Sequence, residues 1–129
     1  MTLTSAVKTQ EDINAVCRNT GGDPVSIANA EQNAELQKRF VLRYAESIIG
    51  YQIPVGEVWT EAGFRWVDGA ENSYTNWRIG SPDNYINGDE RMVCMDGRTG
   101  EWVDLTLGYV ISYVRTIICM SKAIPATTV

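Results

Sequence analysis

Histidine is absent from this chain of 129 residues, and only three cysteines and two phenylalanines are present. Without histidine, the most common general base and the most common zinc ligand are both missing. Nucleophile pairs of the Ser–His or Cys–His type cannot form, so catalysis would depend on carboxylates, lysine or tyrosine. We therefore predict that the protein is not an enzyme.

Long apolar runs and basic clusters are lacking as well. No stretch approaches the roughly 20 apolar residues that a membrane span needs, and residues 1–14 lack the apolar core of a signal peptide. The net charge is −5 and no basic cluster occurs, which argues against a nucleic-acid partner. The length predicts a single domain over 1–129. The composition of 122–129 is that of a tail, which we place after a core at about 9–121.

The three cysteines form no C-x-x-C motif, which excludes a zinc ribbon and a thioredoxin-type site. They are Cys17, Cys94 and Cys119. Their number is compatible with one disulfide and one free thiol, and also with three reduced thiols in a cytosolic protein.

The first part of the chain carries a helical pattern. Thr9 can cap a helix whose apolar positions are Ile13, Val16 and Cys17, with the spacing i, i+3, i+4. The glycine pair at 21–22 ends it.

A second helix is predicted over 30–46, after a short strand-like piece at 23–28. Leu36, Phe40 and Tyr44 recur every four residues and define one apolar face of this helix.

The period changes after the second helix. Short strands are predicted at 47–54, 91–96 and 102–105, with one or two more within 109–121. Residues 68–89 are rich in Gly, Asn, Ser, Asp and Pro and predict a long loop, which in a compact domain is usually functional or disordered. Helices followed by antiparallel strands predict an α+β fold.

Several motifs in this order resemble those of C-type lectin-like domains, from about Thr9 to Ser121. They are "AVCRNTGGDPVSIANAEQNAEL", "IIGY", "FRWVDGAENSYTNWRIGSPDN", "GEWVDL" and "TIIC". The resemblance implies two helices, antiparallel strands and a ligand-binding long loop. It also implies a disulfide between Cys17 and Cys119, stabilising by roughly 4–5 kcal/mol in the chain-entropy model. A disulfide in turn implies a secreted or ectodomain location.

The chain departs from the family pattern at the second disulfide. The two matching positions look like Met92 and Leu107, both apolar, so no single thiol is left behind. We expect Cys94 to face the core as a small hydrophobe. In a shifted alignment Cys94 takes the place of Met92, still without a partner at Leu107.

The long loop contains the triplet Ser81-Pro82-Asp83, which is similar to the X-Pro-X triplet of the family's sugar-binding members. There, a cis proline turns two flanking oxygens toward a calcium ion. A further acid and an Asn-Asp pair complete the site, and sugar hydroxyls fill the remaining places. The positions implied for metal binding are Asp83, Asp89 or Glu90, and Asp104.

Two of the five oxygen groups that the family pattern implies for this calcium site are impaired. Ser81 is shorter than the usual first ligand, and Val103 cannot coordinate a metal. Because calcium takes about six to eight oxygens, we expect it to bind weakly or not at all. The residues predicted to bind a ligand are Arg78, Ser81, Asp83, Asn84, Tyr85 and Asp104.

The tryptophans receive two different predictions. Trp66, Trp77 and Trp102 are expected to pack in the core or at the base of the loop. Trp59 has no family counterpart and is a candidate exposed ligand contact.

We predict a ligand-binding module that binds carbohydrate through the long loop. The alternative is a calcium-independent domain that recognises a protein partner. The sequence makes no prediction of the ligand's identity or of the oligomeric state.

Overall fold

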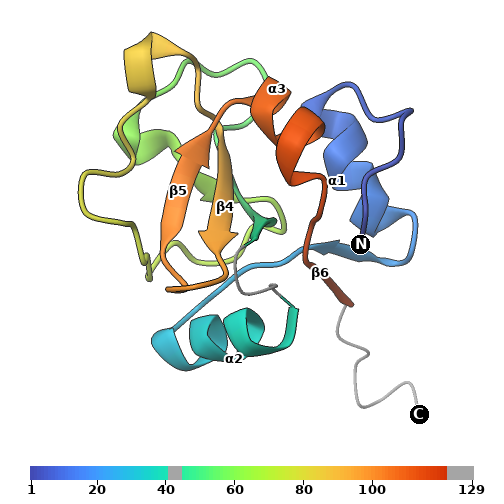
Figure 1. Ribbon diagram of the computed structural model, residues 1–129, viewed down its shortest axis with the longest axis horizontal. Coiled ribbons are helices and arrows are strands. Elements are labelled where there is room, and N and C mark those ends of the chain that lie inside the picture. The colour runs from blue at the N-terminus through green and yellow to red at the C-terminus, as the bar shows by residue number, and fades with distance from the viewer. Residues whose placement is uncertain (41–44, 122–129) are drawn as a thin grey trace.

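The computed structural model describes residues 1–40 and 45–121 (Figure 1). It has an α+β fold, as the sequence predicts. The helices are α1 (Gln10–Arg18), α2 (Ala30–Phe40) and the one-turn α3 (Leu107–Tyr109), with 3-10 turns at Glu61–Gly63 and Tyr85–Asn87 and a π turn at Val110–Val114. The strands are β1 (Gly22–Pro24), β2 (Glu46–Gln52), β3 (Arg65–Trp66), β4 (Met92–Asp96), β5 (Trp102–Leu105) and β6 (Cys119–Ser121). Within the described ranges, no helix is long and apolar enough to cross a membrane.

A four-stranded antiparallel sheet forms the centre of the fold, in the order β3-β2-β4-β5. Strands β1 and β6 form a separate antiparallel pair that brings Pro24 opposite Cys119. Cys119 is joined to Cys17 of α1 by a disulfide, which confirms the pairing that the resemblance implies.

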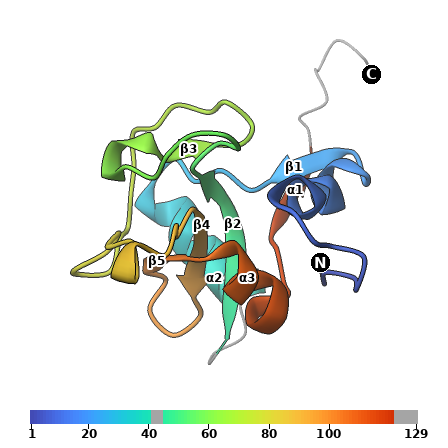
Figure 2. The same cartoon turned by 90° about the horizontal axis from the view of Figure 1, so that it is seen from above.

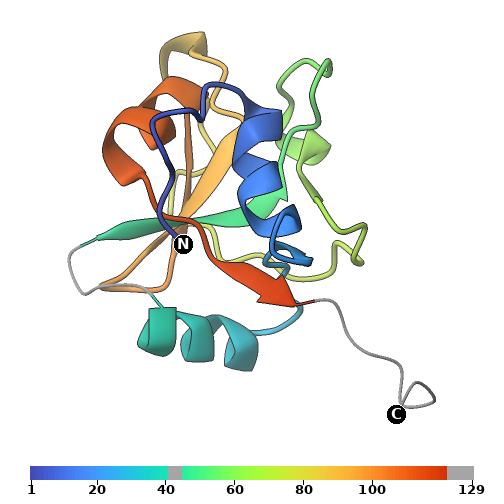
Figure 3. The same ribbon diagram turned by 90° about the vertical axis from the view of Figure 1, so that its right-hand side faces the viewer.

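The central sheet separates two cores, because neighbouring residues of a strand face opposite sides. Along β4, Val93 and Met95 belong to an aromatic core with Trp66 and Trp102. Met92 and Cys94 belong to the second core. Figures 2 and 3 show α2 and α1 on different sides of this sheet, and each helix contributes to a different core.

The second core contains the two apolar residues that the resemblance places at the family's second disulfide. Met92 is fully buried in it, and Leu107 packs against the same cluster. Cys94 is a free thiol buried beside them, as expected for a small hydrophobe. Burial, and secondarily the negative charge of Glu46, raises the pKa of this thiol, which keeps it protonated and unreactive.

Helix α1 begins where the sequence predicts. The Thr9 side chain accepts a hydrogen bond from Asp12 N at 3.0 Å, and Asp12 Oδ2 accepts one from Thr9 N at 3.1 Å. This reciprocal capping satisfies two otherwise free N–H groups. Ile13 and Cys17 are buried, as the apolar pattern indicates.

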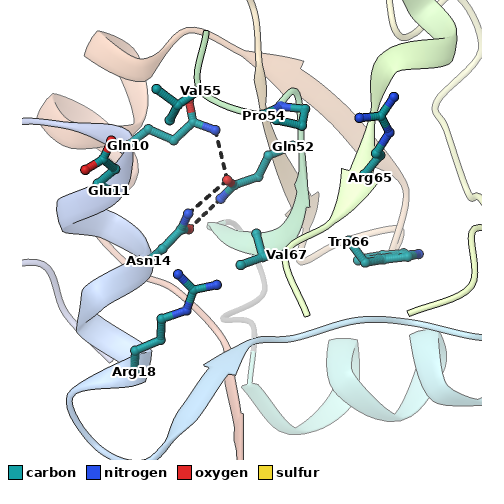
Figure 4. A pocket seen from close by; sticks show the side chains of 10 residues that line it. All are labelled: Gln10, Glu11, Asn14, Arg18, Gln52, Pro54, Val55, Arg65, Trp66 and Val67. Atoms are coloured by element: carbon teal, nitrogen blue, oxygen red, sulfur yellow. Dashed lines mark hydrogen bonds between the residues drawn. The ribbon is translucent and has the colours of Figure 1, made fainter. Parts of the chain in front are cut away.

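Buried amides join α1 to the end of β2 (Figure 4). Gln10 Nε2 donates to Gln52 Oε1 at 2.9 Å and to the carbonyl of Ile53 at 2.8 Å. Asn14 and Gln52 exchange hydrogen bonds of 3.1 and 2.7 Å. These amides line a cavity of about 380 Å³. The network fixes the position of α1 with polar groups that are satisfied inside the protein.

The second helix is shorter than predicted. The structure describes it up to Phe40, and Glu46, the last residue of the predicted helix, is already the first residue of β2. Leu36 packs against the aromatic core, but Phe40 is exposed, and Tyr44 lies outside the described residues. The apolar spacing therefore predicted a longer helix, with a larger buried face, than α2 has. The strand-like piece before it is also shorter, since β1 ends at Pro24.

Of the one or two strands predicted within 109–121, the structure has one, β6, while Val110–Val114 form a helical turn instead. Thr106 Oγ1 accepts a hydrogen bond from Tyr109 N at 3.1 Å and caps the helical turn that follows. This turn buries Val110 completely and leaves Tyr109 and Tyr113 exposed. A β-branched, aromatic sequence favours a strand, but here the local cap and the burial of one side chain outweigh that preference. Only Cys119–Ser121 form a strand.

Candidate functional site

The long loop is attached to the aromatic core through Trp77. Trp77 forms a bridge with Trp102, and Arg78 N donates to the Trp102 carbonyl at 2.9 Å. Trp102 is fully buried and Trp66 is nearly so, while Trp77 is partly buried. The expectation of core or loop-base packing for these three tryptophans agrees with the structure. The Ser81–Pro82 peptide bond, beyond this anchor, is cis.

Three of the four acids predicted for a metal site come together. Asp83 and Glu90 belong to the loop and Asp104 to β5, and one carboxylate oxygen of each lies within 4.8 Å of the others. Asp83 is exposed, whereas Glu90 and Asp104 are only 8% and 3% exposed. We call these three residues the acid cluster.

Backbone N–H groups of the loop hold the acid cluster. Asp104 accepts from Asp83 N at 3.1 Å and from Asn84 N at 2.9 Å, one bond to each oxygen. Glu90 Oε1 accepts from Tyr85 N at 2.7 Å. Asn84 allows the loop to turn its N–H groups toward these carboxylates, because it adopts a left-handed backbone (φ 45°). Its Oδ1 also accepts a hydrogen bond from Glu90 N at 2.8 Å.

The negative charge of the acid cluster is only partly compensated. Burial raises the pKa of Glu90 to about 7; repulsion from Asp104 and Asp83 adds to this, and the Tyr85 N–H opposes it. Burial and the charge of Asp83 also raise the pKa of Asp104. The backbone N–H groups of Asn84 and Asp83, which donate to Asp104, lower it in part. A cation between these oxygens would relieve both effects.

The oxygens of the acid cluster fit a hard divalent cation such as calcium, but they supply an incomplete shell. Calcium takes about six to eight oxygens, and three of the cluster's oxygens already accept N–H bonds. Val103, the position at which the resemblance implies a ligand, packs in the second core, and its side chain supplies no oxygen. Water or ligand hydroxyls would have to complete the coordination.

Two predicted site residues face elsewhere. Asp89 forms an ion pair with Arg91 at 2.9 Å and is not part of the acid cluster. Arg78 pairs with Asp96 and lies 3.9 Å from Glu101, so its guanidinium serves the turn between β4 and β5. Both residues are explained by local ion pairs, which the sequence alone does not distinguish from ligand contacts.

The other three predicted residues lie on the loop around the acid cluster. Tyr85 is 67% exposed and available at the rim. Asn84 is part of the frame that holds the cluster. Ser81 is partly exposed, and its backbone N–H donates to the Arg78 carbonyl at 2.8 Å.

Trp59, the candidate for an exposed ligand contact, is partly buried rather than exposed. Its ring packs edge-on against Phe64 at 6.1 Å, and its Nε1 donates to the Glu90 carbonyl at 2.9 Å. Trp59 therefore helps to hold the backbone of Glu90 in the acid cluster. Pro54 and Gly56 just before it mark a turn, a signal that the chain folds back here.

Residues 6–121 match the lectin C-type domain family. The chain belongs to the C-type lectin domain family. Members of this family are typically binding modules without enzymatic activity.

Among curated C-type lectin relatives, echinoidin of Heliocidaris crassispina is 31% identical over 80 residues, 57% of this chain and 54% of that protein. A perlucin-like protein of Mytilus galloprovincialis is 30% identical over 64% of this chain and 53% of its own length. The chain thus spans about half the length of the curated relatives it matches.

A solved C-type lectin structure, the carbohydrate-recognition domain of the mouse scavenger receptor C-type lectin, superposes with a TM-score of 0.69 at 25% identity. The alignment covers 88% of this chain and 82% of that one. The corresponding domain of cow CD23, solved in the presence of a GlcNAc2Man3 oligosaccharide, gives a TM-score of 0.65 at 25% identity, covering 91% of this chain and 83% of that one.

Proposed function

We propose that this C-type lectin domain binds carbohydrate at the long loop, around the acid cluster. The observation that carries the proposal is the convergence of Asp83, Glu90 and Asp104 within 4.8 Å. Carboxylates grouped in this way accept hydrogen bonds from the hydroxyls of a saccharide or hold a cation that does so. The cow CD23 domain, solved in the presence of an oligosaccharide, supports the choice of ligand class.

Calcium is the cofactor that the acid cluster would hold, and we propose that it binds weakly. When bound, calcium supplies positive charge and open coordination places for hydroxyl oxygens. The lost ligand at Val103 and the N–H bonds already made to Asp104 favour a dissociation constant near the roughly 10⁻⁴–10⁻³ M of extracellular modules. The disulfide supports an extracellular setting, secreted or as an ectodomain.

A glycan array probed with and without calcium tests this function. Asp83→Asn removes the exposed charge of the acid cluster with little change in size, so we expect it to lose the saccharide signal. Glu71→Gln, at an exposed position elsewhere in the loop, is the matched control and should bind normally. No saccharide signal from the native protein, or equal signals from the native protein and Asp83→Asn, would overturn the proposal. Equal melting curves in millimolar calcium and in chelator would remove its calcium component.

A second candidate function is calcium-independent recognition of a protein. It is favoured by exposed apolar side chains on the same loop, since Ile79 is 98% exposed and Tyr85 is 67% exposed. Aromatic residues are enriched in protein interfaces. An array without saccharide hits, combined with a partner whose binding is lost in Tyr85→Ala, would favour this function.

A further inference from the structure

A cleft of about 630 Å³ lies beside the acid cluster, between two segments that are far apart in the sequence. One wall is the segment 56–59. The other is formed by Asn84, Asn87 and Asp89 of the long loop and by Arg91 just after it. Figure 1 shows both segments at the upper end of the molecule, in green and in yellow. The volume is within the roughly 300–1,000 Å³ of small-molecule sites.

The cleft and the acid cluster share their framework. Trp59 in one wall donates to the carbonyl of Glu90 at 2.9 Å. Asn84 in the other wall accepts from Glu90 N and donates its own N–H to Asp104. A ligand held at the cluster can therefore extend into the cleft without leaving the protein surface.

The Arg91 side of the cleft is ordered in the protein alone. The Arg91 guanidinium donates to both oxygens of Asp89 at 3.0 and 2.9 Å, and to the carbonyls of Pro54 and Glu57 at 3.1 and 2.9 Å. Its side chain is only 14% exposed. Groups that are already ordered lose little conformational freedom on binding.

The lining favours a neutral polar ligand. Asp89 is neutralised by Arg91, and Glu57 pairs with Arg65 at 3.0 Å, so the charges that line the cleft already have partners. The groups that a ligand can contact in the cleft are amides, the free lone pairs of the paired carboxylates, and the side chain of Val58, which is 84% exposed. Hydroxyl groups bind to amides and carboxylates, and the C–H face of a sugar ring packs against an apolar side chain.

We infer that this cleft is a second sugar subsite, which selects oligosaccharides over single sugars. The inference rests on the proposed function, because the terminal sugar is held at the acid cluster and the next sugar lies in the cleft. The segment 56–59 supplies the wall that makes this subsite.

The test compares single sugars with oligosaccharides that end in the same sugar, by isothermal titration calorimetry in millimolar calcium. The probes are methyl α-mannoside with the branched mannotriose Manα1-3(Manα1-6)Man, and methyl β-galactoside with lacto-N-neotetraose. For the pair that binds, we expect the oligosaccharide to bind about tenfold or more tightly than its single sugar. Val58→Arg, which places a bulky side chain at the cleft, should reduce this advantage at least fivefold and leave the single sugar unchanged.

Two further variants separate the cleft from general effects. Val55→Arg adds the same charge at an exposed position of the same turn that does not line the cleft, and it should bind both probes normally. Asn87→Asp exchanges amide donors for acceptors at a left-handed position that aspartate tolerates, and it should weaken only the oligosaccharide.

The possible outcomes distinguish this inference from the proposed function. Equal affinities for a single sugar and its oligosaccharide, or an equal loss of both in Val58→Arg, would overturn the subsite and leave the primary site standing. If neither the single sugars nor the oligosaccharides bind, the proposed function and the subsite fall together. Melting temperatures of all variants confirm that each is folded.

Discussion

Replacing Glu90 by glutamine tests the electrostatics of the acid cluster. The pKa of Glu90 is raised from 4.5 to about 7, first by burial and then by neighbouring charges. Between these two pH values the folded protein binds more protons than the unfolded chain. Stability is therefore highest below the unfolded pKa and falls as the pH rises through about 4.5 to 7.

The size of this effect follows from the same pKa change. At about 1.4 kcal/mol per pKa unit, the difference between 4.5 and about 7 corresponds to at most ~3 kcal/mol. Asp83 is exposed, so solvent screens part of the repulsion, and we expect a net effect of ~1–2 kcal/mol. Glutamine resembles the protonated acid and can still accept from Tyr85 N, so Glu90→Gln should be more stable than the native protein by this amount at pH 7.5.

Urea denaturation followed by tryptophan fluorescence, in chelator at pH 4.5 and pH 7.5, measures the prediction. The native protein and Glu90→Gln should be equally stable at pH 4.5 and differ at pH 7.5. Glu46, whose pKa is raised by burial and by Asp96, contributes to the pH dependence of both proteins and cancels in the comparison. Glu71→Gln, at an exposed position, should behave like the native protein. An unchanged pH dependence in Glu90→Gln would refute the reasoning.

Three further predictions concern the stability of the fold, and each is measured as a change in the free energy of unfolding. Replacing Cys17 and Cys119 together by alanine should cost about 4–5 kcal/mol, given a separation of 102 residues; a loss below about 1 kcal/mol contradicts the chain-entropy argument. Gln52→Ala should cost about 1–3 kcal/mol, because the amides of α1 lose their buried partner, and stability equal to the native protein speaks against this role. Gly50→Ala should cost about 1–3 kcal/mol or prevent folding, since its Cβ would lie 2.7 Å from carbonyl oxygens of 24–25; a native-like melting curve contradicts this.

The sequence predicted the parts of the fold that depend on local patterns and on the order of motifs. The start of α1 at Thr9 follows from capping chemistry, and the Cys17–Cys119 disulfide follows from the family resemblance. Within 109–121 the prediction of one or two strands holds for Cys119–Ser121 but not for the helical turn at Val110–Val114. The β-branched and aromatic residues there favour a strand, whereas the Thr106 cap and the burial of Val110 select a helical turn. That choice depends on tertiary contacts, which no local pattern contains.

The candidate site likewise contains residues that the sequence predicts and residues whose contacts it does not. Asp83, Glu90 and Asp104 could be predicted because the triplet and the Trp-x-Asp strand are recognisable in the sequence. Asp89 and Arg78 could not be assigned, because an acid or an arginine in a loop looks the same whether it faces a ligand or a neighbouring side chain. The support that Trp59 gives to Glu90 was missed because it crosses between two loops.

The hydrogen bonds of the acid cluster lead to a final expectation about the order of binding events. Both oxygens of Asp104 and one of Glu90 are held by N–H groups of 83–85, so the loop is organised by its own backbone. A cation that binds here gains charge neutralisation but does not have to fold the loop. We therefore expect saccharide binding to persist, weakened, in chelator, and to be lost when the framework of the loop is disrupted or the charge of Asp83 is removed. Asp104→Ala, which releases both N–H groups, should abolish binding with and without calcium. If chelator alone abolishes saccharide binding completely, the cation and not the backbone organises the site.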